Sequence, residues 1–208
     1  MTRDSQQPTA DTSFLDLIRH GEPEGGPMFR GSQDDPLSET GWKQMRAAIS
    51  DSDCWDAVLT SPLQRCRQFA EEVADTRNLP LFVEPDLREV SFGAWEGRTS
   101  QQILTDFGDQ LNAFWNDPTS TTPPEGEPIE AFYHRVTRAG ELWQRRLAGQ
   151  RVLVVCHGGV IRMLLADVLH IPLSRSFAGF AVPYACRSLI RFDRSEHGLL
   201  RSLLRHGG

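Results

Sequence analysis

Apolar and polar positions along this 208-residue chain fall into two alternating patterns. Short apolar runs, which predict buried strands, occupy residues 14–18, 57–60, 81–84, 152–156 and 188–192. Longer amphipathic segments, which predict helices, occupy residues 38–50, 61–77, 100–115, 129–147 and 158–170. Strands that alternate with helices are typical of a largely parallel sheet with helices on both faces. We therefore expect an α/β protein built as a three-layer α/β/α sandwich with a mostly parallel central sheet.

Chain length and loop signals indicate how this pattern is divided into domains. A chain of 208 residues fits one domain with a sizeable core. Residues 1–12 are polar and carry neither a cationic start nor an apolar stretch, so we expect a flexible tail there. Residues 13–208 are then expected to form a single domain, with Gly- and Pro-rich loops at 21–36 and 117–128.

Composition narrows the classes of partner. The net charge of −6 argues against a nucleic-acid binder, which needs a basic face for phosphate contacts. No apolar run approaches the length that spans a membrane, so we expect no membrane partner. Four cysteines without CxxC spacing are typical of reduced thiols in a cytoplasmic protein. The oligomeric state stays open, a homodimer included.

Two of the apolar runs lead directly into a histidine followed by glycine. His20 ends the run that includes Arg19, and His157 precedes the pair Gly158-Gly159. Ligands of α/β proteins bind in the crevice beyond the carboxyl ends of the strands. A lone buried histidine is usually a core residue, but two such histidines with an adjoining arginine indicate an anion site and a nucleophile.

Two further segments carry candidate chemistry. Ser61 is expected to cap a helix whose first turn holds Arg65, where free N–H groups and a partial positive charge favour an anion. Glu89 lies in an irregular segment near Phe92 and Trp95. A carboxyl group beside apolar rings and a bound anion holds its proton more readily, as a general acid must. Taken singly, Arg65 is more often a surface arginine and Glu89 a surface or salt-bridged glutamate.

Metal and nucleotide chemistry lack support in the sequence. The histidines show no HxH, HxxxH or mixed Cys/His ligand spacing, so we expect no metal. No Walker-type loop and no GxGxxG motif occur, so we expect no cofactor. Cys156 precedes His157 in a strand whose alternation points the two side chains apart, which indicates a core thiol rather than a nucleophile.

Taken together, four motifs in this order resemble the histidine phosphatase superfamily, the phosphoglycerate mutase-like enzymes. The matching residues are Leu17-Ile18-Arg19-His20-Gly21-Glu22, Ser61-Pro62-Leu63-Gln64-Arg65, Leu87-Arg88-Glu89 with Phe92-Gly93, and Val155-Cys156-His157-Gly158-Gly159. Within that family, the α-ribazole phosphatase-like branch is similar in Asp34-Asp35-Pro36-Leu37-Ser38, Trp95-Glu96-Gly97 and the Pro-rich loop before residue 129. The resemblance covers residues 14–192.

The resemblance implies a role for each residue. His20 would attack phosphorus and carry a phosphohistidine, while Arg19 and Arg65 keep its ring neutral by like-charge repulsion. The same arginines, together with His157, would hold the phosphoryl oxygens and stabilise the transition state. Glu89 would protonate the leaving alcohol and then activate water. We therefore expect metal-independent catalysis by these five residues.

Substrate contacts are expected from Arg30, Gly31 and Gly158 in addition to those residues. Where the family often has a hydroxyl residue and an asparagine after the first motif, this chain has Pro23 and Gly26. We expect backbone N–H groups of the loop around Gly26 to replace the missing polar groups.

Specificity is expected to come from residues 25–32 and 107–133, because variable loops carry function. Four aromatic residues in the second region are candidates to stack on a ring or to fill the core: Phe114, Trp115, Phe132 and Tyr133.

The main hypothesis is a phosphomonoesterase for a small phosphorylated metabolite, with α-ribazole 5′-phosphate as a candidate substrate. The first competing hypothesis is a phosphoglycerate mutase-type transfer, but family mutases carry a longer insertion, whereas only 67 residues separate Glu89 from His157 here. The motifs are also compatible with a phosphoprotein phosphatase and with a non-catalytic binding protein. A binding protein is expected to lose a nucleophile or an arginine, and this chain keeps both.

Overall fold

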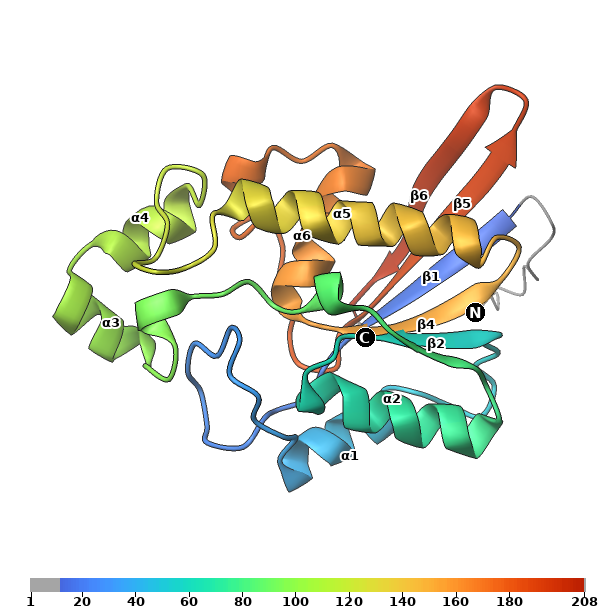
Figure 1. The fold of residues 1–208 in the computed structure, drawn as a ribbon, viewed down its shortest axis with the longest axis horizontal. Coiled ribbons are helices and arrows are strands. Elements are labelled where there is room, and N and C mark those ends of the chain that lie inside the picture. Colours follow the sequence, from blue (N-terminus) through green and yellow to red (C-terminus); the bar gives the residue numbers. More distant parts are fainter. Residues whose placement is uncertain (1–11, 208) are drawn as a thin grey trace.

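The computed structural model describes residues 12–207, whose six strands form one sheet in the order β3-β2-β4-β1-β5-β6 (Figure 1). The strands are β1 Thr12–Arg19, β2 Ala57–Thr60, β3 Leu81–Val83, β4 Arg151–Cys156, β5 Arg187–Ser195 and β6 Gly198–His206. The first four are parallel to one another, whereas β5 runs antiparallel to β1 and β6 antiparallel to β5. The prediction of an α/β protein with a mostly parallel sheet is confirmed.

Helices cover both faces of this sheet (Figure 1). On one face lie α1 (Glu39–Ala47) and α2 (Gln64–Arg77), and on the other lie α5 (Ile129–Arg146) and α6 (Gly158–Leu169). Two short helices, α3 (Ser100–Phe107) and α4 (Gln110–Asn116), lie beyond one end of the sheet and not over a face. Three 3-10 helices complete the described elements: η1 Pro85–Leu87, η2 Gly93–Trp95 and η3 Leu173–Arg175. The expected three layers are therefore present.

The sheet separates two apolar cores, and strand alternation assigns side chains to them. In β4, Val152 and Val154 pack into the core under α5 and α6, whereas Leu153 and Val155 pack into the core under α1 and α2. Because both faces of the strand are buried, its sequence reads as a continuous apolar run. Cys156 belongs to the α5/α6 core, and burial raises the pKa of its thiol well above the ordinary value. The prediction that Cys156 is a core thiol agrees with this position.

Several element boundaries differ from the sequence prediction. The helix expected over 100–115 is broken into α3 and α4 at Gly108, whose φ of +61° is unfavourable for other residues. The tail expected over 1–12 lies outside the described residues except for Thr12, which already belongs to β1. The division into a tail and a single domain stays a prediction.

Strand β6 has no counterpart among the elements that the sequence predicts. Its sequence, GLLRSLLRH, places leucines next to each other and so lacks the strict alternation of a half-buried strand. Leu199 and Leu200 are exposed, whereas Leu203 packs against the core, so pairing with β5 holds most of the strand in the sheet. Among the described helices, none is both long and apolar enough to cross a membrane.

Candidate active site

The register between β1 and β4 brings the two histidine motifs together. Arg19 pairs with Cys156, so the two strands end side by side and each continues into its histidine. The backbone N–H of His20 donates to the Cys156 carbonyl at 2.9 Å, and the His20 and His157 rings meet edge to face at 5.2 Å between centroids. The two histidines therefore lie together at one edge of the sheet, as the sequence predicts.

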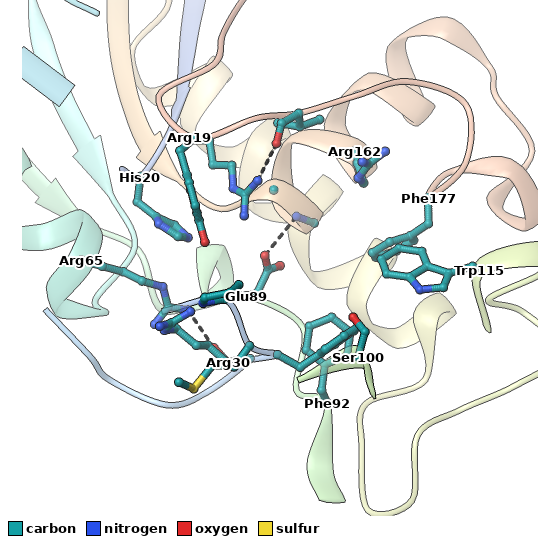
Figure 2. A pocket seen from close by; sticks show the side chains of 18 residues that line it. Arg19, His20, Arg30, Arg65, Glu89, Phe92, Ser100, Trp115, Arg162 and Phe177 are labelled. Atoms are coloured by element: carbon teal, nitrogen blue, oxygen red, sulfur yellow. Dashed lines mark hydrogen bonds between the residues drawn. The ribbon is translucent and has the colours of Figure 1, made fainter. Parts of the chain in front are cut away.

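A cavity of about 320 Å³ opens at this edge (Figure 2). Seven of the predicted site residues line it: Arg19, His20, Arg30, Gly31, Arg65, Glu89 and Gly158. His157 is the exception among the predicted residues. It is fully buried behind His20 and does not line the cavity.

His20 is held in the form that a nucleophile needs. Its Nδ1 lies 2.7 Å from the Gly21 carbonyl oxygen, which can only accept, so Nδ1 carries the proton. Burial lowers the pKa of His20 well below 6.5, and the charges of Arg65 and Arg19 lower it further. The ring is therefore neutral at pH 7, and Nε2 keeps its lone pair.

His157 is also neutral, because burial and the nearby Arg65 lower its pKa well below 6.5. Its Nε2 lies 2.7 Å from the Ser61 hydroxyl. The Cys66 thiol lies within 3.7 Å of both ring nitrogens. The expectation that Ser61 caps a helix is wrong, because Leu63 is the N-cap of α2. The Ser61 hydroxyl accepts from the Leu63 N–H at 3.3 Å and contacts the histidine.

Arg65 is a buried cation and Arg19 a half-buried one, and both are anchored to backbone carbonyls. Arg19 Nη1 donates to the Val182 carbonyl at 2.6 Å, and its guanidinium stacks on the Tyr184 ring at 4.3 Å. Arg65 Nη2 donates to the Gly31 carbonyl at 2.8 Å. The Nε of each arginine is buried without a hydrogen-bond partner in the described part of the chain. Two cations with unused donors are suited to an anion that supplies acceptors.

The loop that follows β1 is tied together by Arg30. Its Nε pairs with Asp35 at 3.0 Å, and its Nη2 donates to the carbonyls of Glu24 and Gly26. Gly26 therefore contributes its carbonyl to Arg30. The expectation that N–H groups of this loop replace the polar side chains absent at Pro23 and Gly26 stays a prediction.

Gly31 is a position that tolerates no side chain. Its φ is +50°, and a Cβ there would lie 2.1 Å from the Glu96 carboxylate. That carboxylate accepts from the backbone N–H groups of Ser32 and Phe92. Glu96 thus joins the loop after β1 to the segment that carries Glu89, and Gly31 provides the space.

Glu89 points toward the N-terminus of α6. Its Oε2 accepts from the Gly159 N–H at 3.1 Å (Figure 2). A Cβ at position 159 would lie 2.3 Å from Glu89 Oε1, and one at position 158 would lie 3.3 Å from Arg19 Nε. The two glycines therefore let a carboxyl group and a guanidinium approach the same helix end.

Arg135 is a site residue that the sequence did not reveal. It donates to the carbonyls of Asp86, Arg88 and Glu89 at 2.7 to 3.0 Å, and it holds the Glu127 carboxylate with two nitrogens. The segment around Glu89 has little regular structure, so this arginine fixes it. Arg135 lies on α5, and nothing local to it signals a contact so distant in sequence.

Aromatic rings form the outer part of the cavity. Phe29, Phe92, Trp115 and Phe177 all line it, and the Trp115 and Phe177 rings lie 5.7 Å apart (Figure 2). Of the four aromatic residues that the sequence offers as candidates, only Trp115 has this position. Phe114 and Phe132 are buried in the core, and the Tyr133 hydroxyl donates to Asp167. The sequence did not reveal Arg162, Phe177 and Tyr184, because they lie outside the recognised motifs.

Within residues 12–207, no group of three or more His, Cys, Asp or Glu side chains is arranged to hold a metal ion.

The model of the histidine phosphatase superfamily (branch 1) matches residues 15–204. The chain belongs to this superfamily. It is 32% identical over 182 residues to the adenosylcobalamin/alpha-ribazole phosphatase of Escherichia coli (strain K12), covering 86% of this chain and 89% of that protein. It is 28% identical over 191 residues to phosphoserine phosphatase 1 of Hydrogenobacter thermophilus, covering 90% of each chain.

Among solved structures, the alpha-ribazole phosphatase of Shigella flexneri superposes with a TM-score of 0.80 at 30% identity. The match covers 94% of this chain and 96% of that one. The predictions of a histidine phosphatase-type enzyme and of a phosphoglycerate mutase-like fold are therefore confirmed.

The two buried histidines of this histidine phosphatase predict how its stability depends on pH. Folding lowers the pKa of His20 and of His157 well below 6.5, so below pH 6.5 the unfolded chain binds more protons than the folded one. We expect the free energy of unfolding to fall as the pH drops below 6.5, by up to about 1.4 kcal/mol per pH unit for each histidine. Urea denaturation at a series of pH values measures this slope.

The variant His157→Gln is expected to reduce the slope. His197→Gln, which changes an exposed histidine, provides the control and is expected to leave it unchanged. An equal slope in the wild type and in His157→Gln would contradict the assignment of neutral buried histidines.

Proposed function

We propose that the protein is a metal-independent phosphomonoesterase that hydrolyses a small phosphorylated metabolite through a phosphohistidine at His20. The observation that carries the proposal is the neutral ring of His20, with a free Nε2, at the base of a cavity that also holds Arg19 and Arg65. A neutral nucleophile between two fixed cations is suited to attack on an anionic phosphate ester.

In the first step, Arg19 and Arg65 bind the phosphoryl oxygens while His20 Nε2 attacks phosphorus. The N–P bond forms as the bond to the leaving oxygen breaks, and Glu89 gives its proton to that oxygen. The phosphorylated ring keeps its proton on Nδ1, where the Gly21 carbonyl accepts a hydrogen bond from it.

In the second step, water attacks phosphorus and the N–P bond breaks. Glu89, now a carboxylate, takes a proton from the water, and inorganic phosphate leaves. His20 is then neutral again, with its proton on Nδ1 and its lone pair on Nε2. Arg135 holds the backbone carbonyl of Glu89 and so is a positioning residue for both steps.

Among the five residues expected to be catalytic, His157 has the least direct role. Its ring packs against His20, and its Nε2 lies next to the Ser61 hydroxyl. These contacts support a role in orienting His20. Direct contact between His157 and a phosphoryl oxygen stays a prediction.

Hydrolysis is favoured over the mutase reaction by the short connection from Glu89 to His157. A mutase returns the phosphoryl group to its substrate and must keep water out. The 67 intervening residues are largely used by α3, α4, α5 and β4, which leaves little chain for an additional lid. A phosphoprotein phosphatase is distinguished by comparing phosphopeptides with small phosphate esters as substrates.

The decisive test of this proposal is phosphate release from p-nitrophenyl phosphate in excess EDTA. We expect full activity in EDTA and a loss of at least about a thousandfold in His20→Ala, because the nucleophile is gone. The exposed variant His197→Ala is the control for altered folding or purification. Activity that EDTA abolishes, or that survives in His20→Ala, would contradict the assignment.

A second experiment addresses the proton transfers assigned to Glu89. For glycerol phosphate, whose alkoxide needs a proton, we expect Glu89→Gln to lower kcat by about a hundredfold or more. p-Nitrophenolate leaves without a proton, so the same variant is expected to release nitrophenol in a burst equal to the enzyme concentration. Hydrolysis of the phosphoenzyme then becomes rate-limiting. Rapid-mixing absorbance measures the burst, and its absence together with equal losses on both substrates would contradict the role.

We further propose α-ribazole 5′-phosphate as the substrate. The names of the Escherichia coli and Shigella flexneri relatives support this choice. The rings of Phe92, Trp115 and Phe177 support it independently, because they line the outer cavity where the leaving group would lie and offer apolar surfaces to a flat base.

This substrate proposal is tested with Trp115→Ala. We expect KM for α-ribazole 5′-phosphate to rise about threefold to tenfold, because stacking on one ring is lost. Hydrolysis of glycerol phosphate, which has no ring, is expected to be unchanged, and Trp115→Phe is expected to restore most of the affinity. An unchanged KM for α-ribazole 5′-phosphate in Trp115→Ala would contradict the proposed binding site for the base.

Cytoplasmic localisation and a homodimer are part of the same proposal. The four cysteines are all free thiols, which supports a reducing compartment. β6 is an edge strand of the sheet and leaves Leu200 65% exposed, which supports pairing with a second copy.

A further inference from the structure

A second cavity, of about 340 Å³, lies between α5, α6 and the β5–β6 hairpin. It shares no lining residue with the catalytic cavity, although both touch α6, the first at Gly158, Gly159 and Arg162 and the second at Leu164, Asp167 and Val168. This second cavity has no part in the reaction proposed above.

The hairpin creates the hollow. Among the described residues, the pairing of β1 with β5 ends at Asp193. The pairing of β5 with β6 continues to Ser195 and Gly198, so the end of this hairpin projects from the sheet (Figure 1). Gly140 of α5 lies against Leu164 of α6, where a Cβ would come within 2.8 Å of the leucine. The two helices therefore touch at this point, and the space between them and the projecting hairpin stays open.

The wall of the cavity that the sheet forms is apolar, and Gln144 of α5 brings an amide to the same space. Its walls include Leu15, Ile190 and Phe192 from the sheet, all buried. Gln144 lines the same space, and its side-chain amide forms no hydrogen bond within residues 12–207 and is not among their buried unpaired polar atoms, so the amide faces the cavity. An amide that faces the cavity without a protein partner offers both a donor and an acceptor to a ligand.

The mouth of the cavity carries an excess of positive charge. Arg201 is bound to Asp167, which also accepts from Tyr133. Arg145 is only 3.9 Å from Glu141, and both side chains are more than half exposed. Arg194 forms no ion pair with any residue of the described chain, which leaves one arginine free for a ligand anion.

We propose that this cavity is a binding site for a small carboxylic acid with a flat apolar body and one polar group. The carboxylate pairs with Arg194 at the mouth, the apolar body covers Phe192 and Leu199, and the polar group bonds to the Gln144 amide. Small-molecule sites usually combine apolar walls with a few placed polar groups or a charged residue, which fix the orientation of the ligand.

Indole-3-acetate is the probe for this site, because it combines a carboxylate, a flat apolar ring and one N–H donor. Isothermal titration calorimetry of the full chain is expected to show saturable binding. Tryptamine, which presents a cation on the same ring, is expected to bind at least about tenfold more weakly. 1-Methylindole-3-acetate, which lacks the N–H, is expected to bind about threefold more weakly, because the Gln144 amide stays unpaired.

Variants assign the binding to this cavity. Arg194→Gln is expected to raise the dissociation constant for indole-3-acetate at least about threefold, whereas Arg205→Gln, at an exposed position on the same hairpin outside the cavity, is expected to leave it unchanged. Gln144→Leu is expected to abolish the difference between indole-3-acetate and its 1-methyl derivative. Circular dichroism confirms that each variant is folded.

Three results would overturn the proposal. The first is no saturable binding of indole-3-acetate to the wild type. The second is binding that Trp115→Ala removes and Arg194→Gln leaves intact, which assigns the probe to the catalytic cavity. The third is a dimer in sedimentation velocity that depends on Arg194 and excludes the probe, which assigns the cavity to a second copy of the chain.

Discussion

The parallel pairing of β1 with β4 is the constraint on which the site depends. It aligns Arg19 with Cys156, so that His20 and His157 leave the sheet at the same level and their rings meet. A slip of one residue would turn alternate side chains to the opposite face of the sheet and separate the two rings. The apolar run of β4, buried on both faces, holds the register, because any slip would move its side chains between two differently shaped cores.

Around this pair, burial and charge act in the same direction. Two buried histidines beside two arginines stay neutral, since a third positive charge there would be unfavourable. Each arginine donates to a backbone carbonyl, Arg19 to that of Val182 and Arg65 to that of Gly31. These hydrogen bonds offset part of the free energy that it costs to remove the two charges from water. The same contacts that keep the cations in place thus fix loops that line the cavity, which couples the stability of the loops to the electrostatics of the site.

Irregular segments reach their positions through single charged side chains. Arg135 binds three backbone carbonyls around Glu89, and Glu96 joins that segment to the loop after β1. Glycines at 31 and 159 make these approaches possible, because a Cβ at either position would overlap a carboxylate. Neither segment has a hydrogen-bonded ladder of its own, so their geometry follows from these contacts.

The alternation of strands and helices, and the family to which the chain belongs, can both be recognised from the sequence alone. These features are local: apolar runs and short motifs are read in windows of a few residues. Tertiary packing alone decided that His157 lies behind His20, that Ser61 contacts this histidine, and that Trp115 faces the cavity while its neighbour fills the core. It also decided that β6 pairs at the edge. Each of these depends on contacts between residues far apart in the chain, and no local pattern encodes which of two adjacent aromatic rings faces a cavity.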